Sequence, residues 1–174
     1  MILVRDRDYF FCEYCGSFHF PQPADDGVRL LDEAPDGLDC PLCKLRLNRA
    51  SLDGNRVYTC ASCRGLLIPL MVFGETVKRL RAKARGPADR PRPLEAMELE
   101  RGITCPSCHQ PMGTHPYFGP GNIVIDTCIE CGLLWLDPGE LRQVIDAPGR
   151  DRGPDAADQM DDLNDSWLAK QLKL

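Results

Sequence analysis

The chain has 174 residues, of which 27% are charged and 43% hydrophobic, and its formal net charge is −5. This charge argues against a protein made mainly to coat nucleic acid. No apolar run approaches the length of a membrane-spanning helix, and the opening "MILVRDRDYFF" holds too short an apolar stretch for a signal peptide. We therefore expect a cytoplasmic protein, in which reduced cysteines serve metal or redox chemistry rather than disulfides.

All ten cysteines fall in five Cys-x-x-Cys pairs. A tetrahedral zinc ion needs four ligands, so two pairs complete one site. Sixteen residues separate the second pair from the third and nineteen separate the fourth from the fifth, and both intervals suit a four-thiolate zinc site. The other two intervals, of twenty-four and forty-one residues, fit less well. The spacing therefore predicts two zinc sites, one of Cys40, Cys43, Cys60 and Cys63 and one of Cys105, Cys108, Cys128 and Cys131.

Residues 1–35 hold the pair that this spacing leaves over, Cys12 and Cys15, with His19 four residues further on. These are three candidate zinc ligands. Water, a nearby aspartate or a second copy of the chain can supply the rest, and a second copy would close the site across a two-fold axis. Alternatively, the pair joins the next knuckle, or it is a metal-free, redox-sensing dithiol. We favour a third zinc site within this segment or across a homodimer.

Residues 36–85 form the first predicted unit. It opens with the knuckle "DCPLCK", continues through a hairpin with a β-rich segment at residues 56–59, and closes with "VYTCASCRGLL" before a short helix. A unit of this size has too few apolar residues to fold alone, and metal is the usual remedy. Structural zinc supplies roughly 10–16 kcal/mol of apparent binding energy, which becomes folding energy.

Residues 76–92 carry seven basic residues and one acid. The first part continues the helix of the first unit, and residues 86–100 form a stiff, Pro-rich linker. The charges favour a nucleic-acid contact or, as the simpler alternative, a solvated helix face. No aromatic residue is interleaved to stack on bases. The candidate contacts to nucleic acid are Lys78, Arg79, Arg81, Lys83 and Arg85.

Residues 101–147 form the second predicted unit, which opens with "TCPSCH" and closes with "VIDTCIECGLLWL". Its opening pair lies 65 residues after that of the first unit, so the chain contains an internal repeat. A helix follows, for which Asp137 is the expected N-cap, Pro138 the first helical residue and Glu140 the capping-box partner. We expect Trp135 to be a core residue.

"CPSCHQPM" and "IDTCIECGLLWLDPGELRQVI" together resemble the bacterial zinc-ribbon family named for its similarity to the ribbon of transcription factor IIB. That family's pattern is CPxC, a hairpin, and CxxCGGxWLDxGEL; here Leu133 replaces the second glycine. Residues 40–80 resemble a diverged second copy, with Leu67 at the tryptophan position and no acidic cap. The resemblance implies zinc at both cysteine sets, more weakly at the first, and does not imply transcription.

Residues 148–174 form an acidic tail. Six aspartates and one arginine fall between residues 151 and 165, a composition typical of disorder. The apolar end "DSWLAKQLKL" can dock on the protein itself or on a partner. The acidic part can also cover the basic helix and compete with polyanions.

The sequence thus predicts a small, metal-stabilised, β-rich fold of tandem zinc ribbons, each a β-hairpin with two knuckles followed by a short helix. No phosphate-binding glycine loop or serine-hydrolase elbow is present. Closed four-thiolate sites leave no position for a reacting water. We therefore expect a non-enzymatic adaptor or regulatory protein with a protein partner, possible links to transcription, and no membrane contact. Direct nucleic-acid binding and redox sensing are the alternatives.

Overall fold

The computed structural model describes residues 27–33, 37–90, 93–94 and 96–153, together with Tyr14 and the backbone of three short N-terminal strands. Cys12, Cys15, the side chain of His19 and the tail from residue 154 lie outside the described residues. The third zinc site and the docking of the tail therefore stay predictions. The three strands pair antiparallel in chain order as β1 (Ile2–Val4), β2 (Tyr9–Phe11) and β3 (Phe18–His19).

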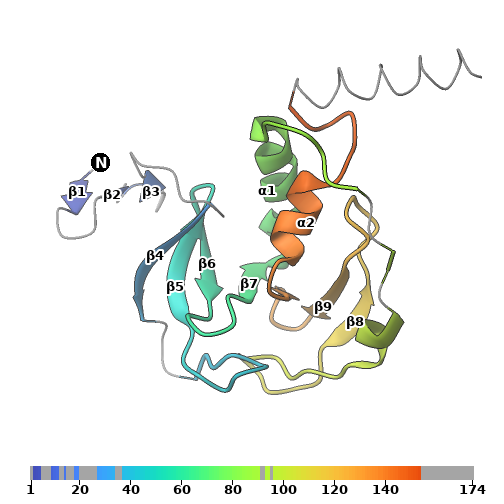
Figure 1. Cartoon of the computed structure of the whole chain (residues 1–174). Coiled ribbons are helices and arrows are strands. Elements are labelled where there is room, and N and C mark those ends of the chain that lie inside the picture. The colour runs from blue at the N-terminus through green and yellow to red at the C-terminus, as the bar shows by residue number, and fades with distance from the viewer. Residues whose placement is uncertain are drawn as a thin grey trace, which may run out of the picture.

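A second sheet, of seven strands, runs through both cysteine-bearing units (Figure 1). Its order is β4-β5-β6-β7-β10-β9-β8, and every neighbouring pair is antiparallel. The strands are β4 (Val28–Glu33), β5 (Asn48–Leu52), β6 (Asn55–Thr59), β7 (Leu66–Pro69), β8 (Gly113–Pro116), β9 (Val124–Cys128) and β10 (Leu133–Leu136).

The turn between β5 and β6 is Asp53-Gly54, and both residues have positive φ, of 48° and 82°. An Asp-Gly pair with this backbone makes the tight hairpin turn whose twist matches the flanking strands. The Asp53 carboxylate then accepts hydrogen bonds from Arg79 and Lys83 of the following helix. The pKa of Asp53 is lowered, because the two cations together outweigh the effect of its burial. The hairpin and the helix of the first unit are thus tied together at the turn.

The two units meet where β7 pairs with β10. The second knuckles of the two units are 68 residues apart, and so are Leu67 and Trp135, which lie opposite each other in this pairing. The two strands therefore pair around an approximate two-fold axis that passes between these residues. The sequence predicted a helix directly after each closing knuckle, whereas a strand, β7 or β10, comes first.

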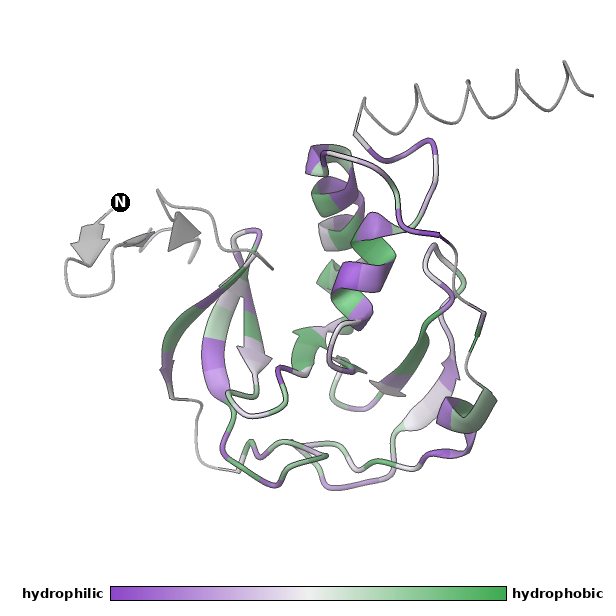
Figure 2. Cartoon of the chain, viewed as in Figure 1, coloured by the Kyte–Doolittle hydropathy of each residue, from purple (hydrophilic) through white to green (hydrophobic). Residues whose placement is uncertain are grey.

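Two α-helices lie side by side against one face of the sheet (Figure 1): α1 (Leu70–Lys83) and α2 (Glu140–Asp146). A short 3₁₀ helix, η2 (Ala96–Glu100), packs near β8. In Figure 2 both α-helices mix hydrophobic and hydrophilic residues, as amphipathic surface helices do. None of the described helices has the length and apolar character needed to span a bilayer.

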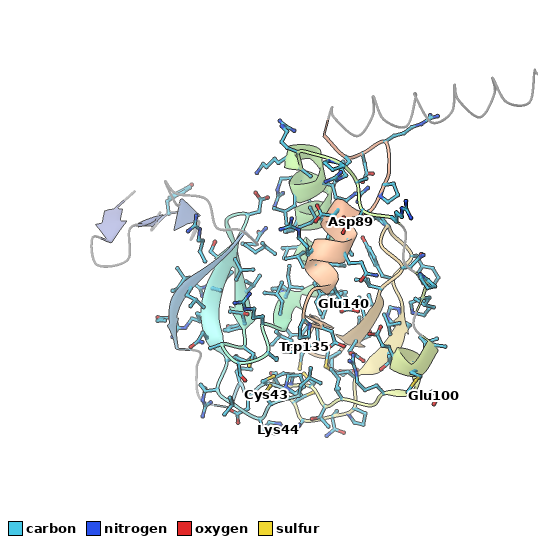
Figure 3. All side chains as sticks on the ribbon, viewed as in Figure 1. Cys43, Lys44, Asp89, Glu100, Trp135 and Glu140 are labelled. Atoms are coloured by element: carbon cyan, nitrogen blue, oxygen red, sulfur yellow. The ribbon has the colours of Figure 1, made fainter. Side chains whose placement is uncertain are left out.

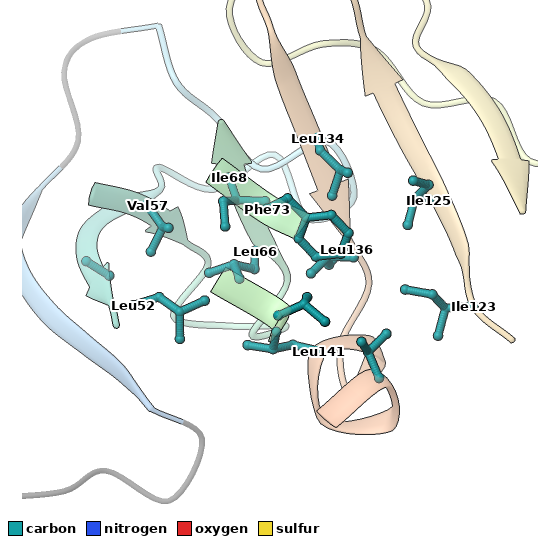
Figure 4. Packing of buried hydrophobic residues seen from close by; sticks show 13 residues of the cluster. Leu52, Val57, Leu66, Ile68, Phe73, Ile123, Ile125, Leu134, Leu136 and Leu141 are labelled. Atoms are coloured by element: carbon teal, nitrogen blue, oxygen red, sulfur yellow. The ribbon is translucent and has the colours of Figure 1, made fainter. Parts of the chain in front are cut away.

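The larger hydrophobic core draws on both units. Figure 4 shows Phe73 of α1 among side chains from β7, β9 and β10. The Phe73 ring also meets Tyr117 of the second unit edge-on, with 5.2 Å between the ring centroids. The structure therefore differs from the expectation of two independent units joined by a linker at residues 86–100. It also places β4, from the segment expected to stand apart at residues 1–35, in the shared sheet.

The buried side chain of Arg81 links α1 to the end of α2. Its side chain is 0% exposed, and it donates to the backbone carbonyls of Val144 and Ala147 at the end of α2. It also forms an ion pair with Asp151, 2.6 Å between Nε and Oδ2, which lowers the pKa of that carboxyl. The last carbonyls of a helix have no partner within the helix, so a cation there satisfies both hydrogen bonds and dipole. Arg81 is thus a structural cation rather than part of a solvated helix face.

Candidate metal centres

Each described knuckle turns through a left-handed residue directly after its second cysteine. These residues are Lys44, Arg64, His109 and Gly132, with φ of 59°, 63°, 60° and 61°. In the first three the N–H donates to the carbonyl of the first cysteine, 2.8 to 2.9 Å away. Glycine reaches this backbone conformation without strain, whereas residues with a Cβ atom adopt it at a modest steric cost. This turn brings the two thiols of each pair to the same side.

The knuckles come together in two four-cysteine clusters, and in each the four sulfur atoms lie within 4.8 Å of one another. The Sγ atoms of Cys40 and Cys63 are 3.7 Å apart, and those of Cys108 and Cys128 are 3.6 Å apart. A tetrahedron with Zn–S bonds of about 2.3 Å has S···S edges of about 3.8 Å. The donor set and its spacing therefore fit zinc, and each cluster can bind one zinc ion. The eight cysteines are the ones that the sequence spacing groups together.

Backbone amides support the sulfur atoms. The N–H of Cys43 points at Cys40 Sγ, 3.3 Å away, and that of Gly65 points at Cys63 Sγ, 3.4 Å away. In the second cluster the Ser107 N–H does the same for Cys105 Sγ at 3.4 Å. Such donors stabilise thiolate charge and hold the ligands in place. Bound zinc would supply the charge that holds four thiolates together in each cluster.

The thiols differ in how readily they lose a proton. Burial raises the pKa of the Cys105 thiol to about 12 and also raises that of Cys63. The N–H of Gln110 lowers the pKa of the half-buried Cys108 thiol to about 7. The Cys105 thiol therefore keeps its proton at neutral pH until a cation displaces it.

Trp135 of β10 packs with residues of the knuckles. It is 0% exposed and belongs to a hydrophobic cluster that includes cysteines of both metal sites. Its six-membered ring lies against Gly65 of the first unit. The indole N–H donates to Asp137 Oδ1, 3.0 Å away. The prediction that Trp135 is a core residue is confirmed, and the side chain contributes to the packing around both metal sites.

The start of α2 differs from the sequence prediction. Gly139, with φ of 90°, stands at the N-cap, and Pro138 lies before the helix. The Asp137 carboxylate does not cap the helix, because it already accepts hydrogen bonds from Trp135 and Arg101. One half of the capping box is present: Glu140 Oε2 accepts the N–H of Asp137 at 2.6 Å.

A buried polar network supports this region. Asp126 of β9 is fully buried and accepts hydrogen bonds from Arg101, at 2.6 Å, and from Thr114, at 2.5 Å. Arg101 also pairs with Asp137, so it links β9 to the segment that precedes α2. Both carboxylates raise the pKa of Arg101 more than burial lowers it. Neither Arg101 nor Asp126 was predicted to have a role, and the one signal in the sequence is an aspartate inside a mostly apolar strand.

The basic residues of the segment 76–92 lie in different environments in the fold. Arg79 and Lys83 are paired with Asp53, and Arg81 is buried. Lys78 and Arg85 are exposed. Arg81 is therefore too deeply buried to contact nucleic acid. Arg79 and Lys83 share the carboxylate of Asp53.

A comparison with protein families supports a zinc-binding fold for the second unit. Residues 104–147 match the family model described as "Transcription factor zinc-finger". The match ends at Ala147, just past the end of α2, and includes the four cysteines of the second cluster. Neither the curated proteins nor the solved structures compared with the chain gave a match. The findings therefore support a zinc ribbon of the transcription factor IIB type in the second unit and a second four-cysteine cluster beside it.

Proposed function

We propose that this protein is a non-enzymatic, zinc-binding adaptor of the cytoplasm, in which two zinc ribbons form one rigid body that binds a protein partner. In this proposal residues 40–80 are a diverged second copy of the ribbon at residues 105–145. The transcription machinery is the first class of partner to test, because of the family that residues 104–147 match. The observation that carries the proposal is that four cysteines fill each metal site. A closed site holds shape and offers no coordination position for catalysis.

The outer surface near the knuckles supports a protein partner. Ile129, inside the closing knuckle of the second unit, is 74% exposed, and Met71 of α1 is 90% exposed. The N–H of Leu70 donates to the carbonyl of Gly132, 2.8 Å away, so α1 begins beside this knuckle. Exposed methionine and branched aliphatic side chains on a rigid scaffold are suited to an apolar contact.

Partner capture with matched variants tests this proposal. The full-length, zinc-loaded chain should retain a specific protein from a native lysate, and the combined change Met71→Asp and Ile129→Asp should abolish that retention. The control is Leu30→Asp, which places the same charge at an exposed position on β4. All variants should keep their zinc. Equal capture by every variant would show that the partner does not use the knuckle surface.

A further inference from the structure

Glu140 is a buried carboxylate with unused hydrogen-bonding capacity. It is only 6% exposed. Its Oε2 accepts the N–H of Asp137, whereas Oε1 is buried and has no hydrogen-bond partner among the residues that the structure describes. Leaving a buried acceptor unpaired has a substantial free-energy cost, so such a group calls for an explanation.

Glu140 lines a pocket of about 240 Å³ in front of α2. Glu98 of η2, Asn122 and Gln143 also line it, so two carboxylates and two amides face the same space. No lysine, arginine or histidine is among the described residues that line this pocket. Arg101 does not line the pocket, and its two terminal nitrogens donate to Asp126 and Asp137.

The charges around Glu140 are mostly of its own sign. Burial raises the pKa of Glu140 to about 8, the negative charges of Asp137 and Glu98 add to this effect, and Arg101 opposes it. The carboxyl therefore holds a proton at neutral pH. A cation placed in the pocket would replace that proton.

We propose that this pocket receives the cationic head group of a basic side chain, an ammonium or a guanidinium, supplied by the protein partner. The inference rests on the proposed adaptor function and names the chemistry of the partner segment. Glu140 and Glu98 provide the negative charge, and the side-chain oxygen of Gln143 is an acceptor, because its amide nitrogen is used on the Gly121 carbonyl at 2.6 Å. A desolvated carboxylate that pairs with a cation forms a strong, charge-assisted hydrogen bond.

The size and the ligands favour such a head group over a bare metal ion. Magnesium and calcium require six to eight oxygen ligands at short, well-defined distances. The pocket offers two carboxylates and two amides around a space of about 240 Å³. A planar guanidinium or an ammonium is larger, and it needs only a few acceptors in a polar cavity.

The test uses the full-length, zinc-loaded protein with small capped amino acids as probes. N-acetylarginine amide and N-acetyllysine amide are the cationic probes, and N-acetylcitrulline amide is the neutral one. The carboxyl resonance of Glu140 is followed by ¹³C NMR through a pH titration. With a cationic probe at about ten times its dissociation constant, the pKa of Glu140 should fall from about 8 to about 7, because the probe binds the ionised form. The citrulline probe should leave the pKa unchanged.

Three substitutions locate the effect. Glu140→Gln keeps a capping-box acceptor and removes the charge, so it should retain both zinc ions and weaken binding of the cationic probes at least about tenfold. Glu98→Gln should weaken binding by a smaller factor. Glu100→Gln is the matched control, because Glu100 ends the same 3₁₀ helix, is exposed and does not line the pocket (Figure 3). It should bind as the wild type does.

Several outcomes would overturn the inference. Equal binding of the citrulline probe, unchanged affinity in Glu140→Gln, or a Glu140 pKa that does not respond to the cationic probes would each do so. A response to magnesium or calcium without a response to the cationic probes would make the pocket a metal site instead. Loss of partner capture in the knuckle variants is measured separately, so failure of this inference and failure of the adaptor function can be told apart.

Discussion

Replacing Gly65 by alanine tests whether Trp135 couples the two metal sites. A Cβ atom at Gly65 would lie 2.7 Å from Cη2 of Trp135 and closer still to Cζ2, whereas ordinary contacts begin at 3.4 Å. The indole is fully buried, and its N–H is held by Asp137, so it cannot move aside without disturbing β10. Overpacking of this kind costs about 1–3 kcal/mol, and we expect about 3 kcal/mol because the obstacle is a rigid aromatic ring.

Urea unfolding of the zinc-loaded chain, followed by tryptophan fluorescence, measures this loss. With a slope of about 2 kcal/mol per molar urea, a loss of 3 kcal/mol lowers the midpoint by about 1.5 M. Gly74→Ala is the control, because Gly74 lies in α1 with open space around the position of a new Cβ. It should raise the free energy of unfolding by about 0.5–1 kcal/mol, since alanine is the better helix former.

Cadmium-113 NMR then shows which site is affected, because each four-thiolate site gives its own resonance when cadmium replaces zinc. Gly65 belongs to the first unit, whereas the ring it would displace belongs to the second. Both resonances should therefore shift or broaden in Gly65→Ala. A change confined to the first site would refute the coupling, and a stability equal to that of Gly74→Ala would refute the packing argument itself.

Three further predictions follow from single groups. Arg81→Met should lower the free energy of unfolding by about 3 kcal/mol in the same urea assay, because it leaves the last carbonyls of α2 without partners. Arg85→Met, at an exposed position, should change the free energy of unfolding little. Equal effects of the two changes would contradict the buried role of Arg81. As the pH rises from 6 to 8, the free energy of unfolding of the wild type should fall relative to that of Glu140→Gln, because the folded chain keeps a proton that the unfolded chain releases near its ordinary pKa of 4.5. Parallel pH curves would contradict the raised pKa of Glu140. Metal analysis should return two zinc ions from the described clusters, and the combined change Cys12→Ser and Cys15→Ser should remove only zinc in excess of two; fewer than two would mean that this pair contributes ligands to a described cluster.

Cysteine spacing predicted most of the metal chemistry. A closed tetrahedral site needs two knuckles at a limited separation, so the grouping of Cys40 with Cys60 and of Cys105 with Cys128 follows from chain geometry alone. The β-rich segments before the closing knuckles are the strands β6 and β9. These features depend on local sequence and on a metal with fixed preferences, which is why they could be predicted.

The joint between the units could not be predicted in the same way. β7 and β10 are four-residue apolar segments, and short apolar runs do not distinguish a strand from the start of a helix. Their identity as strands depends on pairing with each other, which is a tertiary event. Arg81 illustrates the same limit, because among neighbouring basic residues nothing in its local sequence marks it as the one that turns inward to α2.

Pairing of β7 with β10 also brings together positions at which the sequences of the two units differ. Each strand would be an exposed apolar edge in an isolated unit, and antiparallel pairing around an approximate two-fold axis satisfies both edges at once. Two residues after the last cysteine of each unit stand Gly65 in the first and Leu133 in the second. Four residues after it stand Leu67 in the first and Trp135 in the second. All but Gly65 belong to one hydrophobic cluster, and Gly65 leaves the space that the Trp135 ring occupies. A second tryptophan in place of Leu67 would face Leu133 rather than a glycine, so one large and one smaller side chain fill the axis where two large ones would clash.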